Sequence, residues 1–190
     1  MHGAFLVRGR TRTSMVEATV NRLARMALAV LAVAASVFAA YHWCWRRYRC
    51  EVVKEESAAR VKSAYQYPVA MRIEIARAVI PSLRQCADYD PGDFRAPFLL
   101  GSAAAAAEQN EMALSNYESA LRLNERPEIY ANIGLLQLEL GRAEDARRNL
   151  TRAAIFNTAI LASISEPLQS QLYAVARERK ERLLRERERR

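Results

Sequence analysis

The sequence has very few of the residues that catalysis and cofactor binding require. Its 190 residues include 2 histidines, 3 cysteines, 6 glycines and 6 prolines. The histidines are His2, near the N-terminus, and His42, inside an apolar segment, so the rest of the chain holds no Ser/His/Asp or Cys/His set. No glycine-rich phosphate loop and no CxxC spacing is present. We therefore predict a protein that is not an enzyme and that binds no cofactor and no metal.

Negative charge is in deficit, with 21 Asp and Glu against 29 Lys and Arg, which gives a formal net charge of +8. Much of the positive excess flanks an apolar segment near the N-terminus or lies in residues 177–190. Arginines in such places anchor a membrane span or keep a helix soluble. We interpret the tail as a solvated helix, and a tail that binds phosphates or lipid headgroups is the alternative. Residues 94–159 contain no motif that combines aromatic and basic residues, so nucleic-acid binding is not expected.

Two stretches of the chain repeat each other at a spacing of 33 residues. Gly101 recurs as Gly134, and Leu123 recurs as Phe156. The other matched positions are Glu111/Glu144, Ala113/Ala146, Asn116/Asn149, Tyr117/Leu150, Ala120/Ala153 and Asn124/Asn157. Fixed small and apolar positions at a period of about 20–50 residues are typical of stacked helical hairpins. Such solenoids generally bind other macromolecules, so the repeat predicts a docking module.

Residues 94–126 and 127–159 resemble two tetratricopeptide repeats. The positions that carry the resemblance are Gly101, Ala113, Tyr117 and Ala120 in the first segment, and Gly134, Ala146, Leu150 and Ala153 in the second. Glycine or alanine where two helices cross lets the backbones approach closely, and larger residues fill the space beside the contact. The first segment departs from the family pattern, since Pro97 replaces an aromatic residue and residues 108–110 form the turn without glycine.

The expected fold is all-α, with a single N-terminal transmembrane helix, a short α-solenoid of about 2.5–3 tetratricopeptide-like hairpins and a C-terminal capping helix. Upstream of the two repeats, residues 69–93 are interpreted as a partial unit in register with the array. Pro81 should kink or split the helix of this unit. The remaining segments are a juxtamembrane helix at 46–68 and a charged capping helix at 160–190.

Residues 26–45 form the longest stretch without Asp, Glu, Lys or Arg. A helix of this length spans about 30 Å, the thickness of one bilayer core. A basic segment, residues 1–25, precedes it, and Trp43 and Trp45 lie at its far end, as is typical of a membrane boundary. These features favour a transmembrane helix. A signal peptide cleaved near Ala39 and a buried soluble helix are the alternatives.

The positive residues on the two sides of the apolar segment do not decide its orientation. A short basic N-terminus before a single span usually stays inside, which places the repeats outside the cytoplasm. The expected location is therefore a single pass through a bacterial-type inner membrane, with the repeats in the periplasm. The alternatives are repeats on the cytoplasmic face, and a soluble periplasmic protein after cleavage of a signal peptide.

Two cysteines outside the apolar segment, Cys50 and Cys86, are candidates for a disulfide. In an oxidising compartment this bond would tie the juxtamembrane segment to the first helical hairpin. Closing a loop of that length would stabilise the fold by about 4 kcal/mol if the effect is purely one of chain entropy. The alternative is that the two residues are unrelated buried thiols, and the sequence does not favour either interpretation.

The tetratricopeptide resemblance implies a protein-binding groove on the concave face, lined by the first helix of each hairpin. The groove positions that carry over are Arg95, Phe98, Ser102, Glu128, Asn132, Leu135 and Glu139. Asn132 matches an asparagine that often hydrogen-bonds a ligand backbone in such grooves, whereas the family's carboxylate clamp is not supported. Apolar residues together with two carboxylates favour a partly hydrophobic peptide or helix that bears a basic residue. The alternative is that several of these side chains only pack against a neighbouring helix.

These features together predict a non-catalytic, membrane-anchored scaffold that holds a partner protein at the membrane. The partner would bind through the concave groove or through the membrane helix. The alternative function is a structural accessory subunit of a larger membrane complex, packed through its transmembrane helix.

Overall fold

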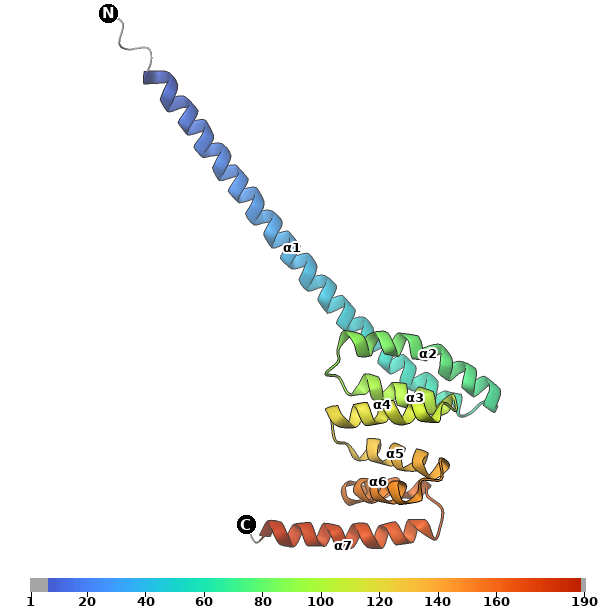
Figure 1. Cartoon of the computed structure of the whole chain (residues 1–190). Helices are drawn as coiled ribbons and strands as arrows, with labels where there is room; N and C mark the ends of the chain where they lie inside the picture. Colours follow the sequence, from blue (N-terminus) through green and yellow to red (C-terminus); the bar gives the residue numbers. More distant parts are fainter. Residues whose placement is uncertain (1–6, 189–190) are drawn as a thin grey trace, which may run out of the picture. The chain divides into compact units, whose positions relative to one another are not determined.

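The computed structural model describes residues 7–188, and all of its regular elements are helices (Figure 1). In chain order they are α1 (Val7–Ala64), α2 (Val69–Tyr89), α3 (Arg95–Ala106), α4 (Asn110–Leu123), α5 (Pro127–Glu139), α6 (Ala143–Phe156), the 3₁₀ helix η1 (Thr158–Ser163) and α7 (Leu168–Glu188). The chain divides into two compact units, Met1–Arg49 and Cys50–Arg190, and α1 contributes to both. The ends of the predicted segments 1–25 and 160–190 lie outside the described residues. The prediction of an all-α solenoid is confirmed.

A long part of α1 that follows its basic N-terminal residues has an exposed apolar surface. The stretch Val20–Ala64 contains a window with a mean hydropathy of 2.1, and none of that window is buried. Large side chains such as Leu28, Val30 and Phe38 are exposed along it. By length and composition this helix is able to cross a membrane, and a signal sequence would have the same properties.

The helix α1 continues without a break across residue 46, where the sequence analysis began a separate juxtamembrane helix. Residues 41–67 contain no glycine and no proline, so no residue there stops the helix. It ends at Ala64, and Pro68 is the residue that precedes α2. The last part of α1, from Cys50 onward, is therefore the first helix of the solenoid.

The unit Cys50–Arg190 is a solenoid of helical hairpins that α7 closes. The end of α1 pairs with α2, α3 pairs with α4, and α5 pairs with α6, and each hairpin packs on the next (Figure 1). The first core joins Val61 of α1 to Leu83 of α2 and Leu100 of α3. The helix α2 runs through Pro81 as one element, so the predicted split does not occur. Pro81 lies on the exposed side, where water can satisfy the carbonyl group that lacks a helical partner.

In each repeat, one glycine lies where the two helices cross. A Cβ atom at Gly101 would lie 2.6 Å from Cδ1 of Tyr117, and one at Gly134 would lie 2.6 Å from Cγ of Leu150. The second would also lie 3.2 Å from the carbonyl oxygen of Ala146. Tyr117 and Leu150 are buried, so a shift of either side chain would disturb its packing. The crossings therefore have no room for even one methyl group.

The two repeats form the turn between their helices with different residues at equivalent positions. Gly141 has a φ of +72°, and Glu108, its counterpart in the first repeat, has a φ of 59°. A left-handed backbone costs a residue with a side chain about 1–2 kcal/mol, and glycine avoids this cost. The carboxylate of Glu108 pairs with Arg72 of α2 at 2.7 Å. This ion pair ties the strained turn to the preceding hairpin.

The C-terminal helix α7 caps the last repeat through one face. Leu172 and Ala176 are buried, and they pack with Leu150 and Ala154 of α6. The helix η1, which the sequence analysis did not predict, lies between α6 and α7 and contributes Leu161 to the same core. From residue 177 onward α7 is exposed up to the end of the described side chains.

Candidate functional site

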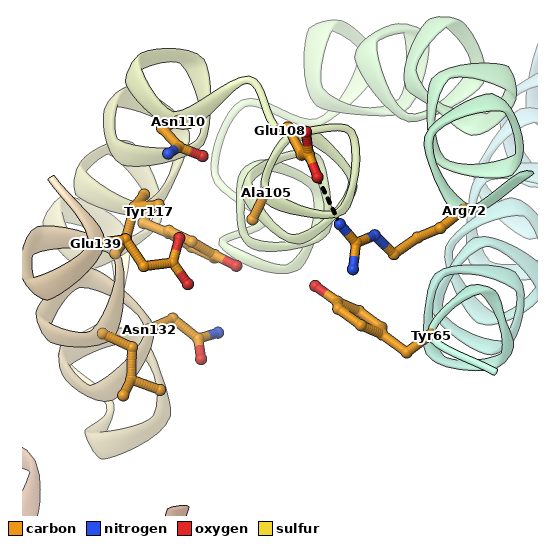
Figure 2. Close-up of a pocket in the computed structure, with 10 residues that line it drawn as sticks. Tyr65, Arg72, Ala105, Glu108, Asn110, Tyr117, Asn132 and Glu139 are labelled. Atoms are coloured by element: carbon orange, nitrogen blue, oxygen red, sulfur yellow. Dashed lines mark hydrogen bonds and ion pairs between the residues drawn. The ribbon is translucent and has the colours of Figure 1, made fainter. Parts of the chain in front are cut away.

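The solenoid carries a groove of about 570 Å³, lined by residues from three successive hairpins (Figure 2). The lining residues are Tyr65, Arg72, Ala105, Glu108, Asn110, Tyr117, Asn132, Leu135, Leu136 and Glu139. Tyr65 lies in the turn that follows α1, Arg72 belongs to α2, and the last four come from α5. Because the lining residues come from all three hairpins, the groove depends on the whole stack.

One wall of the groove is an ion pair set on an aromatic ring. An Nη atom of Arg72 donates to Glu108 at 2.7 Å, and the guanidinium lies over the Tyr65 ring at 5.5 Å from its centre (Figure 2). The Nε atom of Arg72 is buried and has no hydrogen-bond partner among the described residues. Burial raises the pKa of Tyr65, Arg72 partly offsets this rise, and Glu139 adds to it. Glu108 largely balances the charge of Arg72, because the two side chains form an ion pair.

The floor of the groove is a buried phenol held by hydrogen bonds. The hydroxyl of Tyr117 donates to Oγ of Ser102 at 3.2 Å, and Ser102 in turn donates to the carbonyl of Phe98 at 3.1 Å. The side chain of Asn132 also interacts with this hydroxyl. Burial raises the pKa of Tyr117 to about 12, so the phenol stays protonated at neutral pH. It can donate or accept a hydrogen bond, but it supplies no negative charge.

The opposite wall carries the unbalanced charge of the site. Glu139 is exposed, faces the groove and forms no ion pair within the part of the chain that the structure describes (Figure 2). The half-buried side chain of Leu135 and the buried side chain of Leu136 lie on the same helix. With Arg72 and Glu108 paired, the lining has a net negative charge beside an apolar surface. Such a lining can bind a cationic side chain that stands next to an apolar one.

The structure brings three of the seven predicted groove residues together. Asn132, Leu135 and Glu139 line the groove, and all three lie on α5. Ser102 contributes indirectly, since its hydroxyl holds that of Tyr117. Phe98 is half-buried and packs against the Tyr117 ring, with 5.8 Å between the ring centres.

The other two predicted groove residues do not line the groove. Glu128 is exposed at the start of α5 and lies 3.7 Å from Arg126. Arg95 pairs with Glu51 at 2.9 Å and also with Glu55. The position of Arg95 is explained by these acidic residues of α1, which satisfy its charge within the chain.

The lining residues that were not predicted from the sequence include four polar ones. Tyr65 and Arg72 lie upstream of the clear repeats, and Glu108 and Asn110 belong to the turn that departs from the family pattern. A signal for one of them is present in the sequence. Glu108 stands where the second repeat has Gly141, and a charged residue at a position that favours glycine indicates a special role.

A network of charges around the buried Lys54 joins the first two hairpins. Lys54 is 3% exposed, and its ammonium group donates to Asp93 and, at 2.6 Å, to Glu51. Burial lowers the pKa of Lys54, but the hydrogen bonds with Asp93 and Glu51 outweigh burial, and the pKa is raised. Burial raises the pKa of Asp93, but hydrogen bonds from Lys54 and from the Arg95 N–H outweigh it, and the pKa is lowered. The network fixes the start of α3 against α1.

The three cysteines are free thiols in this structure. The thiol of Cys86 is buried and lies 3.9 Å from the carbonyl oxygen of Cys50. Burial, together with the nearby Cys50, raises the pKa of the Cys86 thiol to about 12. A thiol of this kind is nearly unreactive in the folded state. Within the described residues, no three His, Cys, Asp or Glu side chains gather as metal ligands.

No known family model matches the sequence, and no curated protein matches it. Among solved structures, the crystal structure of MamA is similar, with a TM-score of 0.42 and 17% sequence identity. The match covers 72% of this chain and 87% of that one. A likeness of this degree says nothing about function, and the function proposed below is argued from the groove.

Proposed function

We propose that the protein is a non-catalytic interaction scaffold whose groove holds a segment of a partner protein at a membrane. The observation that carries this proposal is the carboxylate of Glu139, which forms no ion pair among the described residues and lies across the groove from the Arg72–Glu108 ion pair. Residues of three hairpins line this groove. The segment that fits presents a lysine or arginine to Glu139 and an apolar side chain to Leu135 and Leu136.

The polar lining supports binding of an extended backbone. The amides of Asn110 and Asn132 and the hydroxyl of Tyr65 offer both donors and acceptors along the groove (Figure 2). A peptide backbone presents alternating N–H and C=O groups, so amides pair with it whatever its sequence. In this proposal the amides hold the backbone, and Glu139 supplies the preference for a basic side chain.

The apolar part of α1 is the proposed membrane anchor. Its exposed surface is apolar over the length of a bilayer core, and Trp43 and Trp45 lie near one end. In this proposal the arginines that precede the apolar part stay inside, and the repeats lie outside the cytoplasm. A partner bound in the groove would then be held beside the membrane.

A selection from a library of random octapeptides tests the groove. The full chain, purified in detergent micelles, should enrich peptides that pair Lys or Arg with an apolar residue. Glu139→Lys should weaken the binding of this class at least about fivefold, because an attraction becomes a repulsion. Glu118→Lys is the matched control, since Glu118 is exposed on α4 and does not line the groove.

Two outcomes of this selection would contradict the proposal. One is the absence of any enriched basic class, and the other is an equal loss of binding in Glu118→Lys, which would indicate a general effect of charge. The accessory-subunit alternative predicts the first outcome, because its contacts would be made by the membrane helix.

A further inference from the structure

A second cleft lies at the C-terminal end of the solenoid, between the end of α6, the start of η1 and α7. Its volume is about 500 Å³. It shares no residue with the groove that Glu139 lines. Any ligand of this cleft would therefore be bound independently of the groove.

The cleft exists because its floor is made of small side chains. Ala154 of α6 and Ala176 of α7 are 0% and 1% exposed, and Ala174 stands beside them with its side chain toward solvent. One wall is the ring of Tyr173, whose hydroxyl donates to the carbonyl of Thr158 at 3.1 Å. This bond ties α7 to η1, so the wall is held in place. The result is a preformed apolar depression on the surface.

The rim of the cleft is positively charged. Arg177 and Lys180 both line it. Arg177 pairs with Glu181 at 3.1 Å, whereas Lys180 forms no ion pair among the residues with described side chains. No residue of η1 is charged, so η1 provides no carboxylate to balance the rim. The cleft therefore combines an apolar floor with an unbalanced cation.

We infer that this cleft is a second docking site, for a protein segment that carries an apolar side chain next to a carboxylate. An apolar side chain of the partner would lie above the buried Ala154 and Ala176 and against the exposed Tyr173 and Ala174. Its carboxylate would pair with Lys180. Because Thr158, Tyr173 and Ala174 are exposed, a small apolar molecule bound in the cleft would stay partly in contact with water. An apolar side chain of a protein segment would be shielded from water by the neighbouring residues of that segment. The preference is opposite to that of the groove, which lacks an unbalanced cation.

The same octapeptide library tests this site on the full chain in detergent micelles. The native protein should enrich a second class, in which Asp or Glu adjoins Leu, Phe or Trp. Lys180→Glu should weaken the binding of this class at least about fivefold. Ala174→Trp should abolish it by filling the cleft, and Ala174 is exposed, so the larger side chain does not disturb the core.

Controls separate this site from the groove and from general charge effects. Arg185→Glu makes the same change of charge on the same helix outside the cleft, and it should leave the acidic class bound. Glu139→Lys should remove the basic class and retain the acidic one, so the two proposals can fail separately. The inference is overturned if no acidic class is enriched, or if Arg185→Glu weakens that class as much as Lys180→Glu does.

Discussion

Replacing Gly134 with alanine should destabilise the solenoid by about 2–3 kcal/mol, although alanine is the better helix former by about 1 kcal/mol. The added methyl group would lie 2.6 Å from Cγ and 2.9 Å from Cδ2 of Leu150. Leu150 is fully buried, and the third neighbour is a backbone oxygen, so the clash cannot be relieved by turning an exposed side chain. Urea unfolding of the full chain in micelles, followed by far-ultraviolet circular dichroism, measures the loss.

Two further variants assign this loss to the crossing of α5 and α6. Gly92→Ala is the control, because the nearest atom to its Cβ is the Asp90 side chain at 3.7 Å, and it should be nearly neutral. Leu150→Ala alone should cost about 2–5 kcal/mol, and the double variant should cost less than the sum by at least about 1 kcal/mol. Strict additivity would contradict a steric clash between these two positions.

Replacing Asp93 with alanine should cost about 2–4 kcal/mol, because it leaves Lys54 buried with only one carboxylate partner. Lys54 is 4% exposed in its side chain and Asp93 is 18% exposed, so solvent screens the pair weakly. Asp88→Ala removes an exposed carboxylate from the end of α2 and should be neutral within about 0.5 kcal/mol. Equal losses in the two variants would contradict a structural role for the Lys54–Asp93 pair.

The pH dependence of unfolding should report the same pair. The pKa of Asp93 is lowered in the folded state, so its contribution is present above the unfolded pKa and is lost as the pH falls through the folded pKa. The pKa of Lys54 is raised, so its contribution is present below the unfolded pKa and is lost as the pH rises through the folded pKa. Stability should therefore fall in acid and in strong alkali. In Asp93→Ala the acid limb of this fall should be shallower.

The hairpins were predictable because their packing is encoded locally. The 33-residue spacing fixes where the small residues of one helix meet the large residues of the next, and α3 to α6 lie within the two repeat segments. The first hairpin was harder to define, since its first helix is the end of α1 and is continuous with the apolar segment. A helix continues where no residue stops it, and the absence of a stop signal produces no periodic pattern in the sequence.

The groove was predictable only in part, for a different physical reason. Positions on α5 follow from the repeat, so Asn132, Leu135 and Glu139 were found. Arg72 enters the site through a long flexible side chain that reaches Glu108 from another hairpin. Such a contact depends on the stacking of the hairpins, so the sequence alone does not show that Arg72 and Glu108 are partners.

Titration calorimetry of the full chain with a selected basic octapeptide, in native and charge-swapped pairs, tests the groove most directly. Glu139→Lys should weaken binding of the basic peptide, and changing the basic residue of the peptide to glutamate should restore binding to that variant. Restoration would place a basic side chain of the ligand against Glu139. Native affinity of the basic peptide for Glu139→Lys, or no restoration by the swapped peptide, would contradict binding through this groove.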